Sequence, residues 1–267
     1  MKCVRHFAAE LLKPRGAHSS AAARSPGADM CKELKTKVLH LLAPTSNVPS
    51  VRQEGHTDGA EILSCTVKAL REGHVVAVPT DTIYGLACLA QNSKAVKKIY
   101  EIKERNGHKP LAISVGEIQD IYKYCKVKVK EALLADLLPG PVTLVFERSE
   151  ALNTDLNPFT PLVGVRIPDH DFMRRLCQMC AEPLALTSAN VSSHTSTVAV
   201  HEFQELWPNL AVVVDGGPIG DNSRLGSTVV DLSVLGKYRI IRPGCALSST
   251  VDVLEHKYGL SEDSGEK

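Results

Sequence analysis

Polar side chains follow a short apolar run near the first third of the chain. Residues 75–78 are apolar and β-branched over the length of a strand. Pro79 ends this run, because proline has no N–H to donate to a ladder. Thr80, Asp81 and Thr82 come next. Ligands of open α/β sheets bind beyond the carboxyl ends of strands. The segment therefore indicates a binding site, although a capped helix start would use the same residue types.

Three cations follow within seven residues at the end of a predicted helix: Lys103, Arg105 and Lys109. The helix dipole favours cations at that end. An arginine offers a bidentate fork and a lysine a point charge, so together they could bind a polyphosphate. The alternative is a solvated basic turn that is paired with neighbouring glutamates.

Further polar residues follow later apolar runs. Ser188 and Asn190 come after the run 183–187, Ser227 precedes another, and Arg242 ends a third. Each of them could instead serve a turn. The sequence contains neither the Gly-x-x-x-x-Gly-Lys-[Ser/Thr] loop nor the Gly-x-Gly-x-x-Gly fingerprint. A nucleotide site in this chain would therefore depend on side chains and on backbone outside these motifs.

Composition excludes several classes of protein. With 31 basic and 30 acidic residues among 267, the net charge is +1, which argues against binding through a global basic field. Aromatic residues are only 4% of the chain, which argues against a strong nucleic-acid binder. No apolar run is long enough for a transmembrane helix. The eight cysteines are irregularly spaced, as in a reduced chain. Cys177 and Cys180 lack the second pair that a zinc site needs, which favours a structural role.

The first 48 residues differ from the rest and are expected to be an N-terminal extension. Residues 1–27 are rich in alanine, serine and arginine, which is typical of a mitochondrial transit peptide but also of a disordered segment. A short helix is predicted over 30–42. The folded domain is expected over 49–258 and a disordered tail over 259–267. Localisation in the cytoplasm and in mitochondria is the corresponding expectation.

Helical and strand-like segments alternate along the domain, which predicts an α/β fold with a mixed sheet. The predicted helices span 60–72, 93–105, 129–138, 169–180 and 249–258. The predicted strands span 75–78, 111–115, 142–147, 162–167, 184–186, 211–214, 228–232 and 239–241.

Five segments, in this order and spacing, resemble the YrdC-type threonylcarbamoyl-adenylate synthase family. They span residues 75–87, 103–111, 183–190, 226–231 and 240–244. The resemblance runs from about residue 59 to Arg242 and on to the C-terminal helix. It implies a twisted mixed sheet that is flanked by helices and has a large concave cleft.

The resemblance also implies a reaction, that of L-threonylcarbamoyladenylate synthase. The amine of L-threonine adds to bicarbonate or carbon dioxide, and the resulting carbamate attacks the α-phosphate of ATP. The products are threonylcarbamoyl-adenylate and pyrophosphate. A separate transferase complex then passes the threonylcarbamoyl group to the adenosine next to the anticodon of certain tRNAs. Such a site must exclude water, since carbamates lose carbon dioxide readily, and cations with Mg²⁺ must offset the phosphate charge.

Roles follow from the resemblance for individual residues. The catalytic residues implied are Lys103, Arg105, Ser188 and Asn190. The residues implied in threonine binding are Thr82, Ser114, Arg166 and Ser227. The residues implied in ATP binding are Arg105, Lys109, Ser188, Asn190, Ser196 and Arg242. No protein side chain is assigned as a metal ligand, and Mg²⁺ is expected to enter with ATP.

Some of these roles have alternatives or departures. Thr82 could cap a helix, and Arg166 could form a buried structural salt bridge, since buried arginines are usually paired. Ser114 stands where some relatives carry a histidine, so it could donate a hydrogen bond but no charge. Many archaeal and bacterial relatives also have an additional C-terminal domain. The sequence ends soon after Arg242, so we expect the catalytic module alone.

Two other functions remain possible from the sequence. The first is a non-catalytic module that binds double-stranded RNA or tRNA, with phosphate contacts from Lys123, Lys126, Lys128 and Lys130. The second is a carbamoyl-transfer module of the hydrogenase-maturation type, which shares this domain. Proteins of that type carry additional zinc-finger-like and acylphosphatase-like domains, and neither is evident here.

Overall fold

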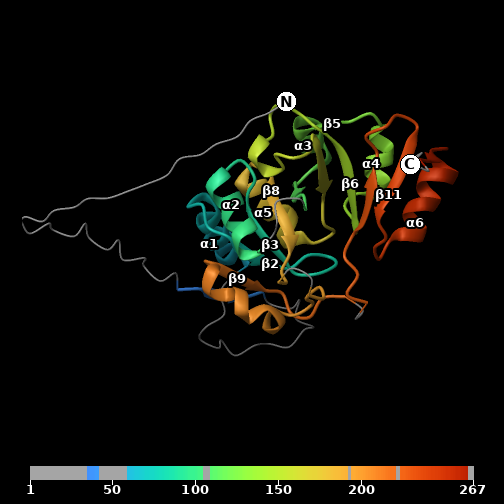
Figure 1. Ribbon diagram of the computed structural model, residues 1–267. Coiled ribbons are helices and arrows are strands. Elements are labelled where there is room, and N and C mark those ends of the chain that lie inside the picture. Colours follow the sequence, from blue (N-terminus) through green and yellow to red (C-terminus); the bar gives the residue numbers. More distant parts are fainter. Residues whose placement is uncertain (1–34, 42–58, 105–108, 192–193, 221–222, 264–267) are drawn as a thin grey trace, which may run out of the picture. The chain divides into compact units, whose positions relative to one another are not determined.

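The computed structural model describes residues 35–41, 59–104, 109–191, 194–220 and 223–263. Within these residues, strands form one twelve-stranded mixed sheet, with helices on both of its faces (Figure 1). The described part of the chain belongs to the compact unit Leu34–Lys267. The predicted fold class, a mixed sheet flanked by helices, is confirmed. No helix of the described residues is long and apolar enough to cross a membrane.

The sheet path does not follow the order of the chain. Its strands, from one edge to the other, are β1 (Lys37–His40), β9 (Val212–Asp215), β2 (Val76–Val78), β3 (Gly85–Leu89), β8 (Leu184–Ser188), β4 (Ala112–Ser114), β7 (Leu162–Arg166), β6 (Val142–Arg148), β10 (Thr228–Asp231), β11 (Lys237–Arg242) and β12 (Ser261–Glu262). β5 (Cys125–Lys126) pairs with β6 outside this path. β2 and β3 are antiparallel, whereas β4 and β7 are parallel. Residues from distant parts of the sequence therefore meet on the central strands.

Six α-helices and shorter helical turns cover the sheet. They are α1 (Gly59–Arg71), α2 (Ser93–Ile102), α3 (Ile118–Tyr124), α4 (Glu131–Leu137), α5 (Asp171–Cys180), α6 (Leu247–Asp252), the 3₁₀ segments η1 (Thr154–Leu156) and η2 (Val200–Asn209), and the π-turn η3 (Val253–Lys257). Local sequence sets several of their ends. Asn92 caps α2 by accepting a hydrogen bond from the Ala95 amide, and Gly73 adopts a φ of +77° just beyond α1.

Alternate side chains of the strands pack into two cores. On one face, α1 and α5 cover Val78 and Leu184. On the other face, Leu86, Phe146 and Val165 pack with the remaining helices. β7 illustrates the alternation, because Val163 and Val165 are buried in the core, while Leu162, Gly164 and Arg166 line a pocket on the opposite face. The pocket therefore lies on the face of α1 and α5, over strands that these helices leave open.

Most predicted elements are confirmed, often with slightly different ends. The helix predicted over 93–105 ends at Ile102. The prediction of a helix over 30–42 is wrong for its described part, because residues 37–40 form β1 and pair in parallel with β9. The sheet thus begins before residue 49, and β12 pairs with β11 inside the predicted tail. Both corrections have the same cause: these strands gain their stability from non-local pairing, which local composition does not reveal.

The polar segment after β2 forms a hairpin loop and does not start a helix. Thr80 Oγ1 accepts from the backbone N–H groups of Thr82 and Ile83, each at 3.2 Å, and donates to the Ile83 carbonyl at 2.7 Å. β3 then begins at Gly85. A Cβ at Gly85 would lie 2.8 Å from Leu186 Cδ1 and 3.2 Å from the Thr187 carbonyl oxygen, so a larger residue here would require the Leu186 side chain to shift. The loop is therefore fixed at the end of the central strands.

Candidate active site

A pocket of about 560 Å³ opens over the central strands. Its walls come from the β2–β3 loop and from strands β3, β8, β4, β7, β6, β10 and β11. Its polar lining residues are Thr80, Lys109, Thr143, Thr160, Arg166, Thr187, Ser188, Ser227 and Arg242. Apolar strand residues such as Val145 and Leu162 form much of the remaining wall. The pocket combines a largely apolar surface with a few convergent polar groups, as small-molecule sites do.

Arg166 lies at one wall of the pocket at the end of β7. Its guanidinium forms an ion pair with Asp81, and it donates to Thr82 Oγ1 from Nη1 at 3.3 Å. Asp81 also accepts a hydrogen bond from the Asp169 backbone N–H at 3.0 Å. Arg166 is 5% exposed, and the side chain of Asp81 is 9% exposed. Arg166 therefore forms the buried salt bridge that was considered as its alternative role, and it also lines the pocket.

The electrostatics of Arg166 favour an incoming anion. Burial lowers the pKa of the Arg166 guanidinium, and the Asp81 carboxylate opposes that shift. The guanidinium still carries its charge at neutral pH, because the normal arginine pKa is far above 7. Its Nε–H is buried and has no hydrogen-bond partner among the described residues. A buried donor without a partner is costly, so a ligand oxygen at this position would be stabilised.

The side chain of Lys103 forms hydrogen bonds with residues at the end of β8. The residue is the C-terminal cap of α2 and is 1% exposed. Its Nζ donates to the Ser188 carbonyl at 2.7 Å, to the Asn190 side-chain oxygen at 3.1 Å and also to the Asn190 carbonyl. Asn190 in turn donates to the carbonyls of Val191 and His194. The predicted signature residues Lys103, Ser188 and Asn190 thus form one hydrogen-bonded group.

Ser227 and Arg242 meet at the opposite wall. Ser227 is 4% exposed and shares a hydrogen bond of 2.8 Å with the Thr143 hydroxyl. Arg242 Nη2 donates to the Ser227 carbonyl at 2.8 Å and to its hydroxyl at 3.3 Å. Gly244 makes this arrangement possible, because a Cβ there would lie 2.4 Å from the backbone of Ser227 and Thr228. The wall is held by backbone contacts that no larger residue could preserve.

Some predicted residues lie elsewhere. Arg105 lies outside the described residues. Ser114 is fully buried beneath α5, where it accepts a hydrogen bond from the Cys177 thiol at 3.6 Å. Its position does not support the predicted threonine contact, and we leave it out of the site. Thr82 does not line the pocket, but it contacts Arg166, which does. Lys109 lines the pocket directly.

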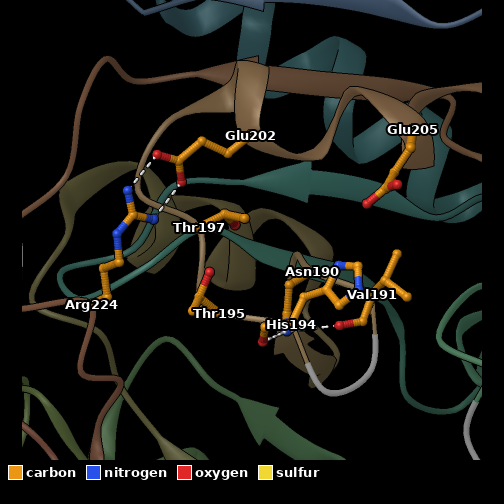
Figure 2. Close-up of a pocket in the computed structure, with 8 residues that line it drawn as sticks. All are labelled: Asn190, Val191, His194, Thr195, Thr197, Glu202, Glu205 and Arg224. Carbon is orange, nitrogen blue, oxygen red and sulfur yellow. Dashed lines mark hydrogen bonds and ion pairs between the residues drawn. The ribbon is translucent and has the colours of Figure 1, made fainter.

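A second, more polar pocket of about 450 Å³ adjoins the end of β8 (Figure 2). Asn190 lines it together with Val191, His194, Thr195, Thr197, Glu202, Glu205 and Arg224. Ser196, predicted to contact ATP, lies between two of these residues and accepts a hydrogen bond from Arg224 through its carbonyl, at 2.9 Å. Figure 2 shows Arg224 facing the carboxylate of Glu202. Asn190 therefore faces the second pocket, while Ser188 lines the first.

The sequence assigned no individual role to several polar residues of the site, among them Asp81, Thr80 and Thr143. Asp81 was noted in the polar segment but received no role, although it pairs with Arg166. Thr80 and Thr143 both line the pocket. Thr80 follows Pro79 in the same polar segment and could have been included. Thr143 lies inside an apolar strand, so only the pairing of β6 with β7 and β10 brings it to the pocket.

The described residues contain no cluster of three or more histidine, cysteine or acidic side chains that could hold a metal ion. Cys177 and Cys180 are both buried. Burial raises the pKa of the Cys177 thiol to about 12, so this thiol stays protonated. This agrees with a structural role for the pair. Mg²⁺ commonly binds through one or two carboxylates together with substrate phosphates. Asp81, the carboxylate that contacts the pocket residue Arg166, is already engaged in that ion pair.

Comparisons with known proteins identify the family of the chain. Residues 68–244 match the Sua5/YciO/YrdC family, whose description is "Telomere recombination". A human protein named threonylcarbamoyl-AMP synthase is 59% identical over 224 residues, which cover 82% of this chain and 80% of the relative.

Two solved structures share the fold. The first is Pyrococcus abyssi Sua5 complexed with L-threonine, with a TM-score of 0.71 and 26% identity, covering 85% of this chain and 62% of that chain. The second is full-length HypF in the phosphate- and nucleotide-bound form, with a TM-score of 0.60 and 27% identity. This second match covers 67% of our chain and only 28% of HypF.

Proposed function

This chain belongs to the Sua5/YciO/YrdC family, and from that premise we propose that it is a threonylcarbamoyl-AMP synthase. The enzyme, a nucleotidyltransferase, forms L-threonylcarbamoyladenylate from L-threonine, bicarbonate or carbon dioxide, and ATP. The observation that carries this proposal is Arg166, a buried guanidinium that lines a 560 Å³ pocket and has an unpartnered Nε–H among the described residues. A carboxylate is the ligand that such a guanidinium binds best.

Threonine would bind with its carboxylate at Arg166. The guanidinium is already held by Asp81 and Thr82, so it is oriented before the substrate arrives. Thr82 would act on threonine through its hydrogen bond with Arg166, and Ser227 would add a direct hydroxyl contact. The pocket walls between these groups are largely apolar, which would exclude water from a labile carbamate. The solved Sua5 complex with L-threonine supports the choice of amino acid.

ATP would bind to the other cations of the same pocket. Lys109 and Arg242 both line it and could contact the phosphates. Ser188, Asn190 and Ser196 would contact the nucleotide, and Lys103 would act through the carbonyls that it holds. Arg105 is also proposed for ATP from the family signature alone. Mg²⁺ would neutralise phosphate charge, held by phosphate oxygens.

The reaction requires no covalent enzyme intermediate. The threonine amine adds to the carbon of carbon dioxide and loses a proton, or it condenses with bicarbonate, in which case a C–O bond breaks and water leaves. Either route gives a carbamate. A carbamate oxygen then attacks the α-phosphorus of ATP, and the bond from that phosphorus to the bridging oxygen of the β-phosphate breaks. Pyrophosphate leaves with the electron pair. The protein contributes positions and fixed charges, which can supply much of the rate acceleration.

The product would serve tRNA modification. We propose that a tRNA threonylcarbamoyl-transferase complex consumes it, and that any binding of tRNA by this chain itself is weak. We also propose that the protein works in the cytoplasm and in mitochondria, with residues 1–27 as a transit peptide. Their composition carries this last proposal. Imaging of the full chain and of a variant without these residues, each fused to a fluorescent protein, tests it. Loss of the mitochondrial signal only in the shortened variant is the expected result.

Two other functions are less well supported. In an RNA-binding module the lysines of residues 123–130 would be free for phosphates, but Lys126 pairs with Glu147 at 2.7 Å and Lys128 donates to the Ser233 carbonyl. The relatives named as synthases also favour catalysis over binding alone. The match to HypF covers only 28% of that protein, so a hydrogenase-maturation role would require domains for which the match gives no support.

The test of the proposed function is an assay of pyrophosphate release by the purified full chain with ATP, Mg²⁺ and radiolabelled bicarbonate. We expect release that requires both threonine and bicarbonate, with incorporation of label into a threonylcarbamoyl-adenylate product. Serine in place of threonine is the matched control for the amino acid. Folded protein that releases no pyrophosphate above the enzyme-free level would refute the synthase.

A further inference from the structure

Arg224 connects two loops that carry different parts of the proposed site. It lies between β9 and β10, three residues before Ser227, and its backbone has a φ of +52°. This conformation is uncommon for a residue other than glycine and persists only where the surroundings maintain it. Its side chain crosses to the segment that contains Ser196 and Glu202 (Figure 2). The strained backbone and the long contact indicate that the position of this arginine is specifically maintained.

The contact is a fork of three hydrogen bonds. Nη1 donates to Glu202 Oε2 at 2.8 Å and to the Ser196 carbonyl at 2.9 Å, while Nη2 donates to Glu202 Oε1 at 2.7 Å. Only an arginine offers this planar set of donors, because a lysine has a single charged nitrogen. Bidentate geometry makes the pair stronger than an ordinary surface ion pair.

Glu202 extends the contact into the neighbouring backbone. Its Oε2 also accepts from the Val198 N–H at 2.9 Å. Thr197 precedes Val198 in the chain. Its hydroxyl donates to the Ala189 carbonyl at 2.8 Å, and its backbone carbonyl accepts from the Tyr84 N–H at 2.9 Å. The segment that Arg224 holds is thus tied to the end of β8, where Ser188 and Asn190 lie.

The backbone that follows Arg224 leads to the wall of the main pocket that Ser227 and Arg242 form. The chain continues through Gly226 to Ser227, whose carbonyl accepts from Arg242 at 2.8 Å. The Gly226 carbonyl accepts from the Cys245 N–H at 3.1 Å. Arg224 therefore connects the segment of Ser196, which its side chain contacts, with the segment of Ser227, which follows it in the chain.

We propose that the Arg224–Glu202 ion pair positions these two segments together, so that the ATP contacts and the threonine contacts of the site are correctly placed at the same time. The inference rests on the proposed function. Arg224 and Glu202 line the second pocket and not the main one, and their guanidinium and carboxylate are engaged with each other, so we treat them as positioning residues. Breaking the pair weakens the binding of both substrates and leaves the chemical step less affected.

The experiment compares Arg224→Ala, Arg224→Lys, Glu202→Gln and the double variant Arg224→Ala/Glu202→Gln with the unmodified full chain. KM for threonine, KM for ATP, kcat and the thermal midpoint are measured for each. Lys257→Ala is the control, because it removes an ion pair of similar length, 2.7 Å to Asp136, away from both pockets. We expect both KM values to rise about tenfold in Arg224→Ala, with kcat lowered less than about threefold. Lys257→Ala should leave both KM values unchanged.

The other variants sharpen the test. Arg224→Lys should raise both KM values less than Arg224→Ala does. The double variant should raise them no more than Arg224→Ala or Glu202→Gln alone, because all three remove the same ion pair. Unchanged KM values with a lowered thermal midpoint would show a purely structural pair and overturn the inference. A rise in only one KM would overturn it too, because the pair is proposed to hold both segments.

Hydrogen exchange separates this inference from the proposed function. The Val198 amide and the amides of residues 224–227 should exchange faster in Arg224→Ala than in the unmodified chain, whether or not the protein makes product. An inactive unmodified chain refutes the synthase. Unchanged exchange at both segments refutes the positioning role.

Discussion

Arg166, which lines the pocket, forms an ion pair with Asp81 although the two residues are 85 positions apart in the chain. The carboxylate comes from the β2–β3 loop and the guanidinium from the end of β7. Asp81 neutralises the buried charge before substrate arrives and fixes its orientation through a second contact, from the Asp169 backbone. The pair therefore stabilises the fold and also prepares a carboxylate-binding site.

Arg166→Ala should destabilise the protein more than it would at the surface. The variant leaves Asp81 buried without its partner, a situation that costs about 3–5 kcal/mol in other proteins. Denaturant unfolding of the purified variant measures this loss. Arg174→Ala is the control, because it also removes an arginine with two carboxylate partners, Asp169 and Asp171, whose side chains are 68% and 87% exposed. Equal losses in both variants would contradict the role of burial.

Arg166→Lys separates binding from folding. A lysine keeps the positive charge near Asp81 but cannot offer the planar fork that a carboxylate requires. We expect KM for threonine to rise at least about tenfold, with a much smaller change in KM for ATP. The measurement is pyrophosphate release at varied concentrations of each substrate. An equal rise in both constants would place Arg166 outside the threonine site.

Lys103→Met should lower the rate of synthesis far more than the same substitution at Lys97, an exposed lysine of α2. Methionine has a similar length but cannot donate to Ser188 or Asn190, so their carbonyls would lose a charged donor in a buried site. We expect kcat/KM to fall about a hundredfold or more. Lys97→Met, on the same helix and 79% exposed at its side chain, is the control and should retain activity. Near-normal turnover by folded Lys103→Met would exclude the proposed role of this lysine.

The fold was largely accessible from the sequence because its central elements have strong local patterns. The helix at 60–72 and the strand at 75–78 were placed within a few residues. β1 and β12 were missed because short strands depend on partners distant in sequence, β9 and β11. β3 was missed for a different reason: its residues Gly85–Leu89 contain small side chains that give no clear alternation.

The site was accessible only in part. The resemblance led to Arg166, Ser188 and Ser227, and the structure brings all three to one pocket. It also led to Ser114, which the structure buries against Cys177. The correspondence of motifs shows which strand carries a residue, but not which part of that strand a helix covers. Ser114 is paired with Arg166 across β4 and β7 and therefore lies on the same face of the sheet. α5 covers the end of β4, so the side chain of Ser114 lies in the core.

Gly244→Ala should disturb the wall formed by Ser227 and Arg242. The added Cβ would lie 2.4 Å from backbone atoms of Ser227 and Thr228, which must then move. Overpacking of this kind costs about 1–3 kcal/mol. We expect a lower thermal midpoint and raised KM values for both substrates. Gly59→Ala is the matched control, because nothing lies within 4 Å of a Cβ there. If both alanine variants behave alike, the close approach at Gly244 has no functional weight.

The pH dependence of stability should report the state of Glu202. Arg224 and the Val198 amide hold the pKa of this carboxyl at about 2, below its usual value of 4.5. A depressed pKa means that the folded state favours the ionised form. The stabilisation is therefore complete above about pH 4.5 and is lost as the pH falls toward 2. Glu202→Gln removes the ionisable group, so its free energy of unfolding should lack this component.

Urea unfolding of both proteins at a series of pH values and constant ionic strength measures the effect. The unmodified chain should be more stable than Glu202→Gln at pH 7, and the difference should shrink between about pH 4.5 and pH 2. Glu205→Gln is the control, because Glu205 lies on the same segment, whereas both carboxylate contacts of Arg224 go to Glu202 (Figure 2). Its difference from the unmodified chain should not follow the same curve. A constant difference between the unmodified chain and Glu202→Gln down to pH 2 would show that the contact with Arg224 does not depend on the charge of the carboxylate.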